Sequence, residues 1–431
     1  MEISRKLLSH WQQNRRLTQN TVIKLSSELV GRVASFLLTV VAARWLGEAT
    51  FGWYNYGLAL GFVVTQLADM GLQLLISREV AVRGRQAQPF VQTAFHLKLF
   101  FSLPVIALLI FVTGGQDGSI RLSLILLGLM LLSQTYLEFV GYVFRGQQAL
   151  WPEAWLTGGA RLLTAGAGFL VLYFGGNLLL LTVSGTLAVV GVTLVGLWQL
   201  HRSGWLYFPT VRGILVLPHS SVLMRQALPL GVSIFLSIAY TRLGVLLLQY
   251  QLGETAVAQF SAAARLVEPM QIIPASLLAA TFPLISLAWQ ENRGRAIRLG
   301  WQLGLFLASC GLGLALVFWL AAAWLIPWLY GPAYPDTVAV LQLLALSLPL
   351  AFINFTLTHH LIARQQQSYI VWFNLIMLSS HALFTWLLIP RQGVVAPAIS
   401  VIVAEGFLLC ACLLTLSLTQ REKVTIQVPK G

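Results

Sequence analysis

The chain has 431 residues, of which 57% are hydrophobic and only 10% are charged, and its mean hydropathy is +0.78. Soluble globular proteins carry about 25% charged residues, so this composition excludes an ordinary soluble enzyme, and the low charge also excludes a disordered chain. The net charge of +13 does not predict a nucleic-acid partner, because the basic residues lie in short connections between apolar runs and not on one folded domain. A polytopic membrane protein is the class that remains.

Twelve apolar runs follow one another along the chain, each long enough to cross a bilayer, which takes about 20 apolar residues. They lie at 20–44, 52–77, 90–112, 119–144, 155–174 and 177–199, and then at 222–250, 256–289, 298–322, 337–362, 368–389 and 394–418. They predict an all-α integral membrane protein with twelve transmembrane helices in two lobes. The predicted parts are a cytoplasmic N-terminal segment 1–19, an N-lobe 20–205, a cytoplasmic linker 206–221, a C-lobe 222–418 and a cytoplasmic tail 419–431.

The basic residues of the connections predict the orientation. If the twelve runs alternate in direction, 18 Lys and Arg residues lie on one side and only Arg44, Arg121 and Arg391 on the other. Because Lys and Arg accumulate on the cytoplasmic side, we expect both termini to be inside. The first 20 residues are polar and basic and lack the pattern of a cleavable signal peptide, so the first span is expected to serve as the insertion signal.

Two short segments recur in the two halves. Residues 46–54 (LGEATFGWY) and 252–260 (LGETAVAQF) align without a gap at an offset of 206, and 145–148 (RGQQ) and 364–367 (RQQQ) lie at equivalent inner ends. A duplication of six spans gives parallel repeats, for which the binding site is expected between the lobes near the middle of the membrane. This is an architecture of transporters.

The first span carries three charges on one face. Lys24, Glu28 and Arg32 fall within a stripe of about 100° together with small and polar residues. One interpretation is a self-neutralising ladder at i, i+4 spacing that only holds helices together. We favour a cavity-lining face, because three charges leave one cation unmatched and polar stripes within membranes line pathways.

The second half has its own charged spans. Arg242 lies on the seventh run, while Arg265 and Glu268 lie three apart on the eighth and are expected to pair on one face. Prolines of the eighth run remove backbone donors and predict kinks. Such a helix is equally compatible with a gate and with a bent packing element. The prolines are Pro269, Pro274 and Pro283.

The other charges within the spans are interpreted in two ways. Asp69, Lys98 and Glu138, together with Glu268, are expected to form structural charge contacts that hold helices together. Glu405 lies near the middle of the last run without a partner on its own helix, and is a candidate protonatable or ion-coupling group. The five cations and five anions counted in this way balance, so the charges alone do not predict a cationic cavity.

Signatures of catalysis and cofactor binding are not found in the sequence. It has no Gly-rich phosphate loop with its lysine, no HExxH and no GxSxG. The adjacent His359 and His360 face different ways on a helix, and Cys410 and Cys412 do so too, so neither pair predicts a metal site. We expect no enzyme activity, no cofactor and no metal.

The segments 43–54 (ARWLGEATFGWY), 67–72 (LADMGL) and 77–79 (SRE) resemble the polysaccharide transporter branch of the MOP exporter superfamily, the oligosaccharide flippases of bacterial inner membranes. The resemblance covers the whole chain in span number, length and duplication, and it is most specific over residues 20–85. It implies two six-helix lobes around a cavity that opens alternately to each side. It also implies a polyprenyl-pyrophosphate-linked glycan as cargo, with Arg32 and Arg265 on the cavity helices of the two lobes. Further implied partners are membrane lipids and glycan polymerase or assembly proteins.

Two other classes of membrane protein remain as alternatives. The multidrug (MATE) branch of the superfamily typically has an acidic residue early in its first span for cation coupling, whereas the stripe here is Lys24–Glu28–Arg32, which suits an anionic cargo better. A membrane glycan polymerase or ligase usually presents a long external loop with basic residues, and the outward loops here are short. The peptidoglycan-precursor flippase branch usually has two further C-terminal spans that this sequence lacks.

Overall fold

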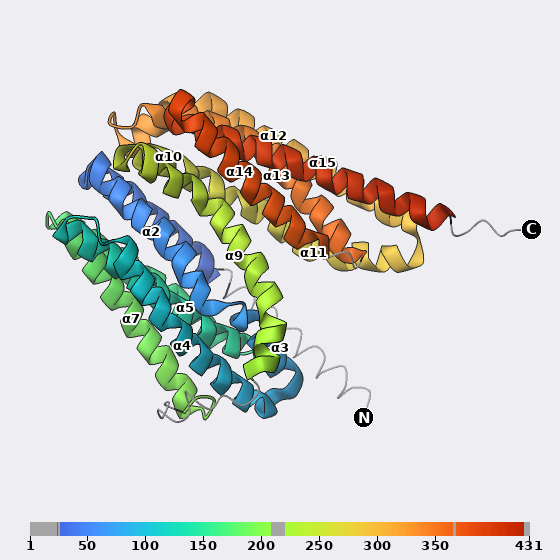
Figure 1. Ribbon diagram of the computed structural model, residues 1–431, viewed down its shortest axis with the longest axis horizontal. Helices are drawn as coiled ribbons and strands as arrows, with labels where there is room; N and C mark the ends of the chain where they lie inside the picture. The colour runs from blue at the N-terminus through green and yellow to red at the C-terminus, as the bar shows by residue number, and fades with distance from the viewer. Residues whose placement is uncertain (1–23, 25, 208–219, 365–367, 426–431) are drawn as a thin grey trace, which may run out of the picture. The chain divides into compact units, whose positions relative to one another are not determined.

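The computed structural model describes residues 24, 26–207, 220–364 and 368–425 (Figure 1). Within these ranges every regular element is helical and no strand occurs, so the predicted all-α class is confirmed. The predicted segment 1–19, most of the linker 206–221 and residues 365–367 of the second repeated motif lie outside the described residues.

The helices follow the apolar runs closely. The first part of the chain forms a helix at Ser26–Trp45, then α2 (Glu48–Asp69), α3 (Leu72–Arg83), η1 (Gly84–Ala87), α4 (Gln88–Val112), α5 (Gly118–Gly146), α6 (Leu150–Tyr173) and α7 (Leu178–Arg202). The second part forms α9 (Ser220–Gln251), α10 (Glu254–Val267), η2 (Glu268–Gln271), α11 (Ile272–Glu291), α12 (Arg293–Tyr330), α13 (Asp336–Ala363), α14 (Ser368–Gln392), η3 (Gly393–Val395) and α15 (Ala396–Thr425).

Ten helical stretches among the described residues are long and apolar enough to cross a membrane. The last of them, Tyr369–Leu416, covers most of α14 and of α15, and the 22-residue α2 is not among the ten. The chain is therefore a multi-pass membrane protein. The number of twelve spans and the orientation of the termini stay predictions.

Contacts divide the chain into two compact units. The first unit comprises Met1–Leu46 and Gly57–Phe235, and the second comprises Gly47–Tyr56 and Leu236–Gly431. The beginning of α2 thus belongs with the second unit, and the beginning of α9 belongs with the first. The predicted lobe boundaries differ from this division in these two helices, and the two-lobe organisation stays a prediction.

In the first unit α5 is the central helix and packs against α3, α6 and α7. Small residues allow helices to approach closely where lipid gives no hydrophobic drive for association. A Cβ on Gly57 would lie 2.5 Å from a methyl carbon of Leu127, and one on Gly128 would lie 2.6 Å from a methyl carbon of Leu109. These glycines bring α2 and α4 onto α5.

In the second unit α13 is central and packs against α10, α12 and α15, while α14 packs on α15 (Figure 1). Gly311 of α12 lies against the backbone of α13, where a Cβ would come within 2.8 Å of Cα of Pro349. The side chains of Leu361 and Cys412 are fully buried between α13 and α15.

Two of the predicted spans are broken. The predicted span 52–77 is wrong as one continuous helix, because the chain turns at Met70 and Gly71, with φ of 48° and 77°, between α2 and α3. Gly71 meets the backbone of α9 there, since a Cβ on it would lie 2.6 Å from the nitrogen of Gly231. The kink predicted for 256–289 is confirmed: α10 ends at Val267, and Pro269 lies at the start of the short helix η2.

Candidate functional site

The charges of the first helix do not form the ladder considered from the sequence. Lys24 donates through Nζ to Oε1 of Glu153 on α6, at 2.9 Å. The carboxylate of Glu153 is buried and also accepts from Arg145 of α5, whose Nε lies 3.2 Å from Oε1. The interpretation of Lys24, Glu28 and Arg32 as a self-contained ladder is therefore wrong, because a carboxylate from another helix binds the lysine.

Arg32 and Glu28 lie near an arginine of α6. The side chain of Arg161 packs against Gly31, where a Cβ would lie 2.9 Å from Cδ of the arginine, and the charges of Glu28 and Arg32 act on it. Its Nη1 is buried and has no hydrogen-bond partner among the described residues. Arg32 itself is exposed and forms no ion pair within the described part of the chain. Two guanidinium groups thus lie on neighbouring helices, and the carboxylates of Glu28 and Glu138 act on Arg161 without forming an ion pair with it.

Asp69 and Lys98 form a buried ion pair in the first unit. Nζ of Lys98 donates to Oδ1 of Asp69 at 2.7 Å, and both side chains are almost inaccessible, at 0% and 4% exposure. The ammonium group also lies 5.4 Å from the ring centre of Tyr136, whose hydroxyl is 2.7 Å from that of Ser102. Such a pair fixes α2 against α4, and the purely structural role of these residues stays a prediction.

Glu138 has a neutral partner. Its Oε1 accepts from Nε2 of Gln134 on the preceding turn of α5, at 3.2 Å, and no cation lies within ion-pair distance of it among the described residues. The expected contact of Glu138 with Asp69 and Lys98 is therefore electrostatic and not a direct hydrogen bond.

In the second unit the pairing differs from the prediction. Glu268 accepts from both terminal nitrogens of Arg242 on α9, at 3.0 and 3.4 Å, and not from Arg265. Because α10 ends at Val267, Arg265 and Glu268 do not share a regular helical face. Nη2 of Arg265 instead donates to Oδ1 of Asn55 at 3.3 Å, and Arg265 has no carboxylate partner in the described ranges.

Glu405 is buried in the second unit among neutral donors. Nδ2 of Asn354 donates to Oε2 of Glu405 at 2.7 Å, and the hydroxyl of Tyr240 lies 3.4 Å from Oε1. The ring of His381 meets that of Tyr240 edge to face, with centres 5.2 Å apart. No basic residue of the described chain forms an ion pair with Glu405, so its environment differs from that of Asp69, Glu153 and Glu268.

The two copies of the repeated segment meet through Gln259. Its amide nitrogen donates to a carboxylate oxygen of Glu48 and, at 3.0 Å, to the carbonyl of Ala333, while its Oε1 accepts from the backbone and hydroxyl of Thr337 at 3.0 and 2.7 Å. The sequence comparison aligned these segments but did not predict that they contact one another.

Two charged residues were missed in the sequence. Glu153 and Arg161 both lie within or at the edge of the predicted span 155–174, and a complete count of charges in the apolar runs would have included Arg161. Glu153 lies just outside the expected boundary, and only the fold shows that it accepts from Lys24 and Arg145.

Some of the charges in the described spans are paired, while Glu28, Glu138 and Glu405 form no ion pair with the described residues. Asp69, Glu153 and Glu268 each bind a cation, whereas Arg32, Arg161 and Arg265 form no ion pair with the described residues. Guanidinium groups bind anions with bidentate hydrogen bonds. No group of three or more metal-ligating side chains occurs in the part of the chain that is described.

Comparisons with known proteins agree with this fold. The model of the family described as "Polysaccharide biosynthesis protein" matches residues 17–289, more than half of the chain. An inward-facing multidrug resistance MATE family transporter of the MOP superfamily superposes with a TM-score of 0.73 at 15% identity, over 93% of this chain and 99% of the other. The lipid II flippase MurJ, in an inward closed conformation, gives 0.69 at 14% identity, over 92% and 87%. The search of curated proteins gave no match.

The chain shares the all-helical fold of these transporter and flippase structures. The chain belongs to the polysaccharide biosynthesis protein family.

Proposed function

We propose that the protein is a flippase that moves a polyprenyl-pyrophosphate-linked oligosaccharide across the bacterial cytoplasmic membrane by alternating access, for the synthesis of a lipopolysaccharide or an exopolysaccharide. The family's description supports a role in polysaccharide synthesis, and one structurally similar protein is a flippase of lipid II. The proposed protein partners are a glycan polymerase or assembly proteins, which would receive the glycan after it has crossed the membrane.

One observation carries the proposal: Arg32, Arg161 and Arg265 form no ion pair with the described residues, whereas Asp69, Glu153 and Glu268 each bind a cation. The opposite charges cancel within the ion pairs Asp69–Lys98 and Glu268–Arg242. The carboxylate of Glu153 binds two cations, Lys24 and Arg145. Arg32, Arg161 and Arg265 remain to attract an anion.

The chemistry of the cargo fits these groups. A diphosphate in a membrane loses its water unless charged donors replace it, and guanidinium groups do this with charge-assisted bonds. Of the five residues predicted to line a cavity, Lys24 and Arg242 already bind carboxylates and Glu28 is an acid. We therefore propose Arg32 and Arg265 as pyrophosphate-binding residues and add Arg161, with Lys24, Glu28 and Arg242 setting the charge around them.

The test is transbilayer movement of a polyprenyl-pyrophosphate-linked oligosaccharide in proteoliposomes. Wild type is compared with Arg32→Ala, Arg161→Ala and Arg265→Ala. A charge-assisted hydrogen bond contributes about 1.5–3 kcal/mol, so each variant is expected to weaken apparent cargo affinity about 10- to 100-fold. Thermal unfolding of each purified variant shows whether the protein is still folded.

Arg202→Ala is the matched control, because this exposed arginine at the end of α7 lies over Trp198 and is not assigned to cargo. Its transport is expected to equal that of wild type. Wild-type protein that moves no lipid-linked glycan, or arginine variants as active as Arg202→Ala, would overturn the proposal.

A second candidate function is supported by Glu405. A buried carboxylate with only neutral donors suits the binding of a proton or cation, as a MATE-type exporter requires. Cation-coupled efflux of small amphiphiles that is lost in Glu405→Gln and kept in Arg32→Ala would favour this function over the flippase.

A further inference from the structure

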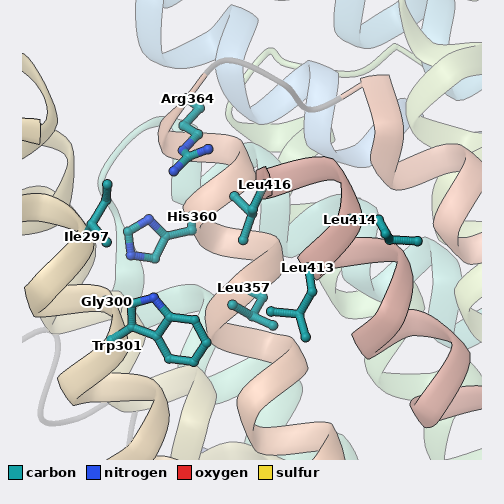
Figure 2. Close-up of a pocket in the computed structure, with 9 residues that line it drawn as sticks. All are labelled: Ile297, Gly300, Trp301, Leu357, His360, Arg364, Leu413, Leu414 and Leu416. Atoms are coloured by element: carbon teal, nitrogen blue, oxygen red, sulfur yellow. The ribbon is translucent and has the colours of Figure 1, made fainter. Parts of the chain in front are cut away.

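The helix α12 borders a pocket on each of two faces. On one face Ile297, Gly300 and Trp301 lie opposite His360 of α13, around a pocket of about 420 Å³ (Figure 2). On another face α12 packs against α11, and the groove between these two helices has a volume of about 340 Å³. We call it the α11–α12 groove. Its lining includes Leu284, Leu287, Glu291, Arg295, Leu299 and Leu303.

The α11–α12 groove is apolar along most of its length. The side chains of Leu284 and Leu287 are 62% and 52% exposed, beside the buried Ile285 and Ala288. All four belong to the apolar stretch Glu254–Glu291, which is long enough to cross a membrane, so the exposed leucines meet hydrocarbon and not water. A ligand of this groove must therefore be present in the bilayer and carry an apolar chain.

One end of the groove carries an acid and a base. Helix α11 ends at Glu291, and Arg295 lies in the first turn of α12, where its backbone nitrogen donates to Oδ1 of Asn292 at 3.1 Å. Both charged side chains are exposed, and neither forms an ion pair with any residue in the described ranges. They lie where one apolar stretch ends and the next, Gly294–Tyr330, begins, which is the level of lipid headgroups.

Each of these two charges has the sign that its own helix end disfavours. The C-terminus of a helix attracts cations and the N-terminus attracts anions. Here α11 ends on the acid Glu291, while α12 has the base Arg295 in its first turn. A ligand that brings a cation to Glu291 and an anion to Arg295 compensates both side chains and both helix ends.

We propose that the α11–α12 groove binds a zwitterionic phospholipid with a primary ammonium group, with the ammonium on Glu291, the phosphate on Arg295 and an acyl chain along the leucines. Carboxylate and guanidinium groups form charge-assisted hydrogen bonds with such partners. From Arg295 to Leu303 the lining of α12 extends over eight residues, or about 12 Å, which accommodates the upper part of an acyl chain.

Other ligands leave part of this lining without a partner. A free phosphate or a free amine makes no use of the leucines. An anionic lipid without an ammonium group leaves the carboxylate of Glu291 beside a second negative charge. A lipid with a quaternary ammonium group cannot donate a hydrogen bond to that carboxylate. The primary ammonium phospholipid is the ligand that satisfies the acid, the base and the apolar wall together.

This proposal does not rest on the flippase function, because the groove lies wholly within the second unit and includes none of the arginines assigned to the cargo. A lipid bound between α11 and α12 would also stabilise their packing, because a ligand that binds only the folded state raises its stability.

The experiment measures retention of added lipid by the purified full-length protein, using native mass spectrometry. The probes are phosphatidylethanolamine, phosphatidylcholine and phosphatidylglycerol with identical acyl chains. Wild type is expected to retain phosphatidylethanolamine most strongly. Loss of one charge-assisted contact in Glu291→Gln should weaken binding of this lipid about tenfold and leave phosphatidylcholine unchanged. Arg295→Gln should weaken both, because they share the phosphate, and Leu299→Trp should weaken all three by filling the apolar wall.

Arg298→Gln is the matched control, because Arg298 is also exposed near the start of α12, three residues from Arg295, but does not line the groove. Its lipid binding should equal that of wild type. Equal losses in Arg295→Gln and Arg298→Gln would reduce the effect to general surface charge and overturn the site.

Two further results would overturn the assignment of the headgroup. One is wild-type protein that retains phosphatidylcholine or phosphatidylglycerol as strongly as phosphatidylethanolamine. The other is undiminished phosphatidylethanolamine binding in Glu291→Gln. This variant changes an exposed side chain at a helix end, so it remains informative if Leu299→Trp fails to fold.

Discussion

Gly52 of α2 lies directly against the backbone carbonyl of Glu254, the first residue of α10: a Cβ on this glycine would lie 1.8 Å from the carbonyl oxygen. Both helices begin in the same way, after a glycine in the left-handed region, with φ of 79° at Gly47 and 86° at Gly253. The two segments recognised as a repeat in the sequence therefore share their backbone geometry and pack on one another.

This contact predicts a large effect of Gly52→Ala. The methyl group must push α2 and α10 apart, and overpacking of this kind costs about 1–3 kcal/mol, more than the gain of about 1 kcal/mol from helix propensity. The melting temperature of the purified protein in detergent should fall.

Gly166→Ala is the matched control, because Gly166 also lies within a helix but has no atom within 4 Å of an added Cβ. It should leave the melting temperature unchanged or raise it. Equal melting temperatures of the two variants would show that the close contact of Gly52 with Glu254 is not formed.

The buried pair Asp69–Lys98 predicts strong non-additivity. Lys98→Met alone leaves a buried carboxylate without its cation, and breaking such a pair costs about 3–5 kcal/mol. The double variant Lys98→Met, Asp69→Leu removes both charges and should recover most of the lost stability. Thermal unfolding is measured for wild type, Lys98→Met, Asp69→Leu and the double variant, which together form a double-mutant cycle.

The second measurement on this pair is the rate at which the double variant moves the lipid-linked glycan across the bilayer. If Asp69 and Lys98 only hold α2 and α4 together, the double variant should transport at nearly the wild-type rate. A stable double variant without transport would give the pair a role in moving the cargo.

The sequence predicted the fold class well, because long apolar runs have few structural solutions in a bilayer. It could not place the break at Met70 and Gly71, since the turn there depends on the approach of Gly231 on a distant helix. The helical spacing between Arg265 and Glu268 was misleading for a related reason: the helix ends between them, at Val267.

The candidate site was predicted less completely than the fold. Charges within apolar runs can be found by counting, and Lys24, Arg32, Arg265 and Glu405 were found in that way. Their partners come from other helices, so the pairing of Lys24 with Glu153 required the tertiary structure.

The number and direction of the spans can be tested by cysteine labelling. After replacement of the three native cysteines, single cysteines are placed at Gly115 and Phe174, between α4 and α5 and at the end of α6, and at Gln147 and Ser203 at the ends of α5 and α7. With both termini inside, a membrane-impermeant maleimide should label the first two in intact cells and the last two only after permeabilisation. Labelling of 115 and 203 from the same side would contradict the predicted order of spans.

Glu405→Gln separates ion coupling from folding. The amide oxygen of the new glutamine can still accept from Nδ2 of Asn354, which lies 2.7 Å from the carboxylate in the native protein, so we expect a change in unfolding free energy of less than about 1 kcal/mol. The substitution removes the site at which a proton or cation would bind. Transport driven by an imposed ion gradient should therefore be lost, while exchange of cargo without a gradient continues.

Glu138→Gln is the control for this experiment, because Glu138 also accepts from a neutral amide, Nε2 of Gln134 at 3.2 Å, but is not assigned to coupling. It should respond to the gradient as wild type does. A Glu405→Gln protein that keeps the full gradient response would remove Glu405 from the coupling mechanism and leave its bond with Asn354 as a packing contact between α13 and α15. If both variants lose the response, the effect follows from the loss of negative charge within the membrane in general, and not from the position of Glu405 beside Tyr240 and Asn354.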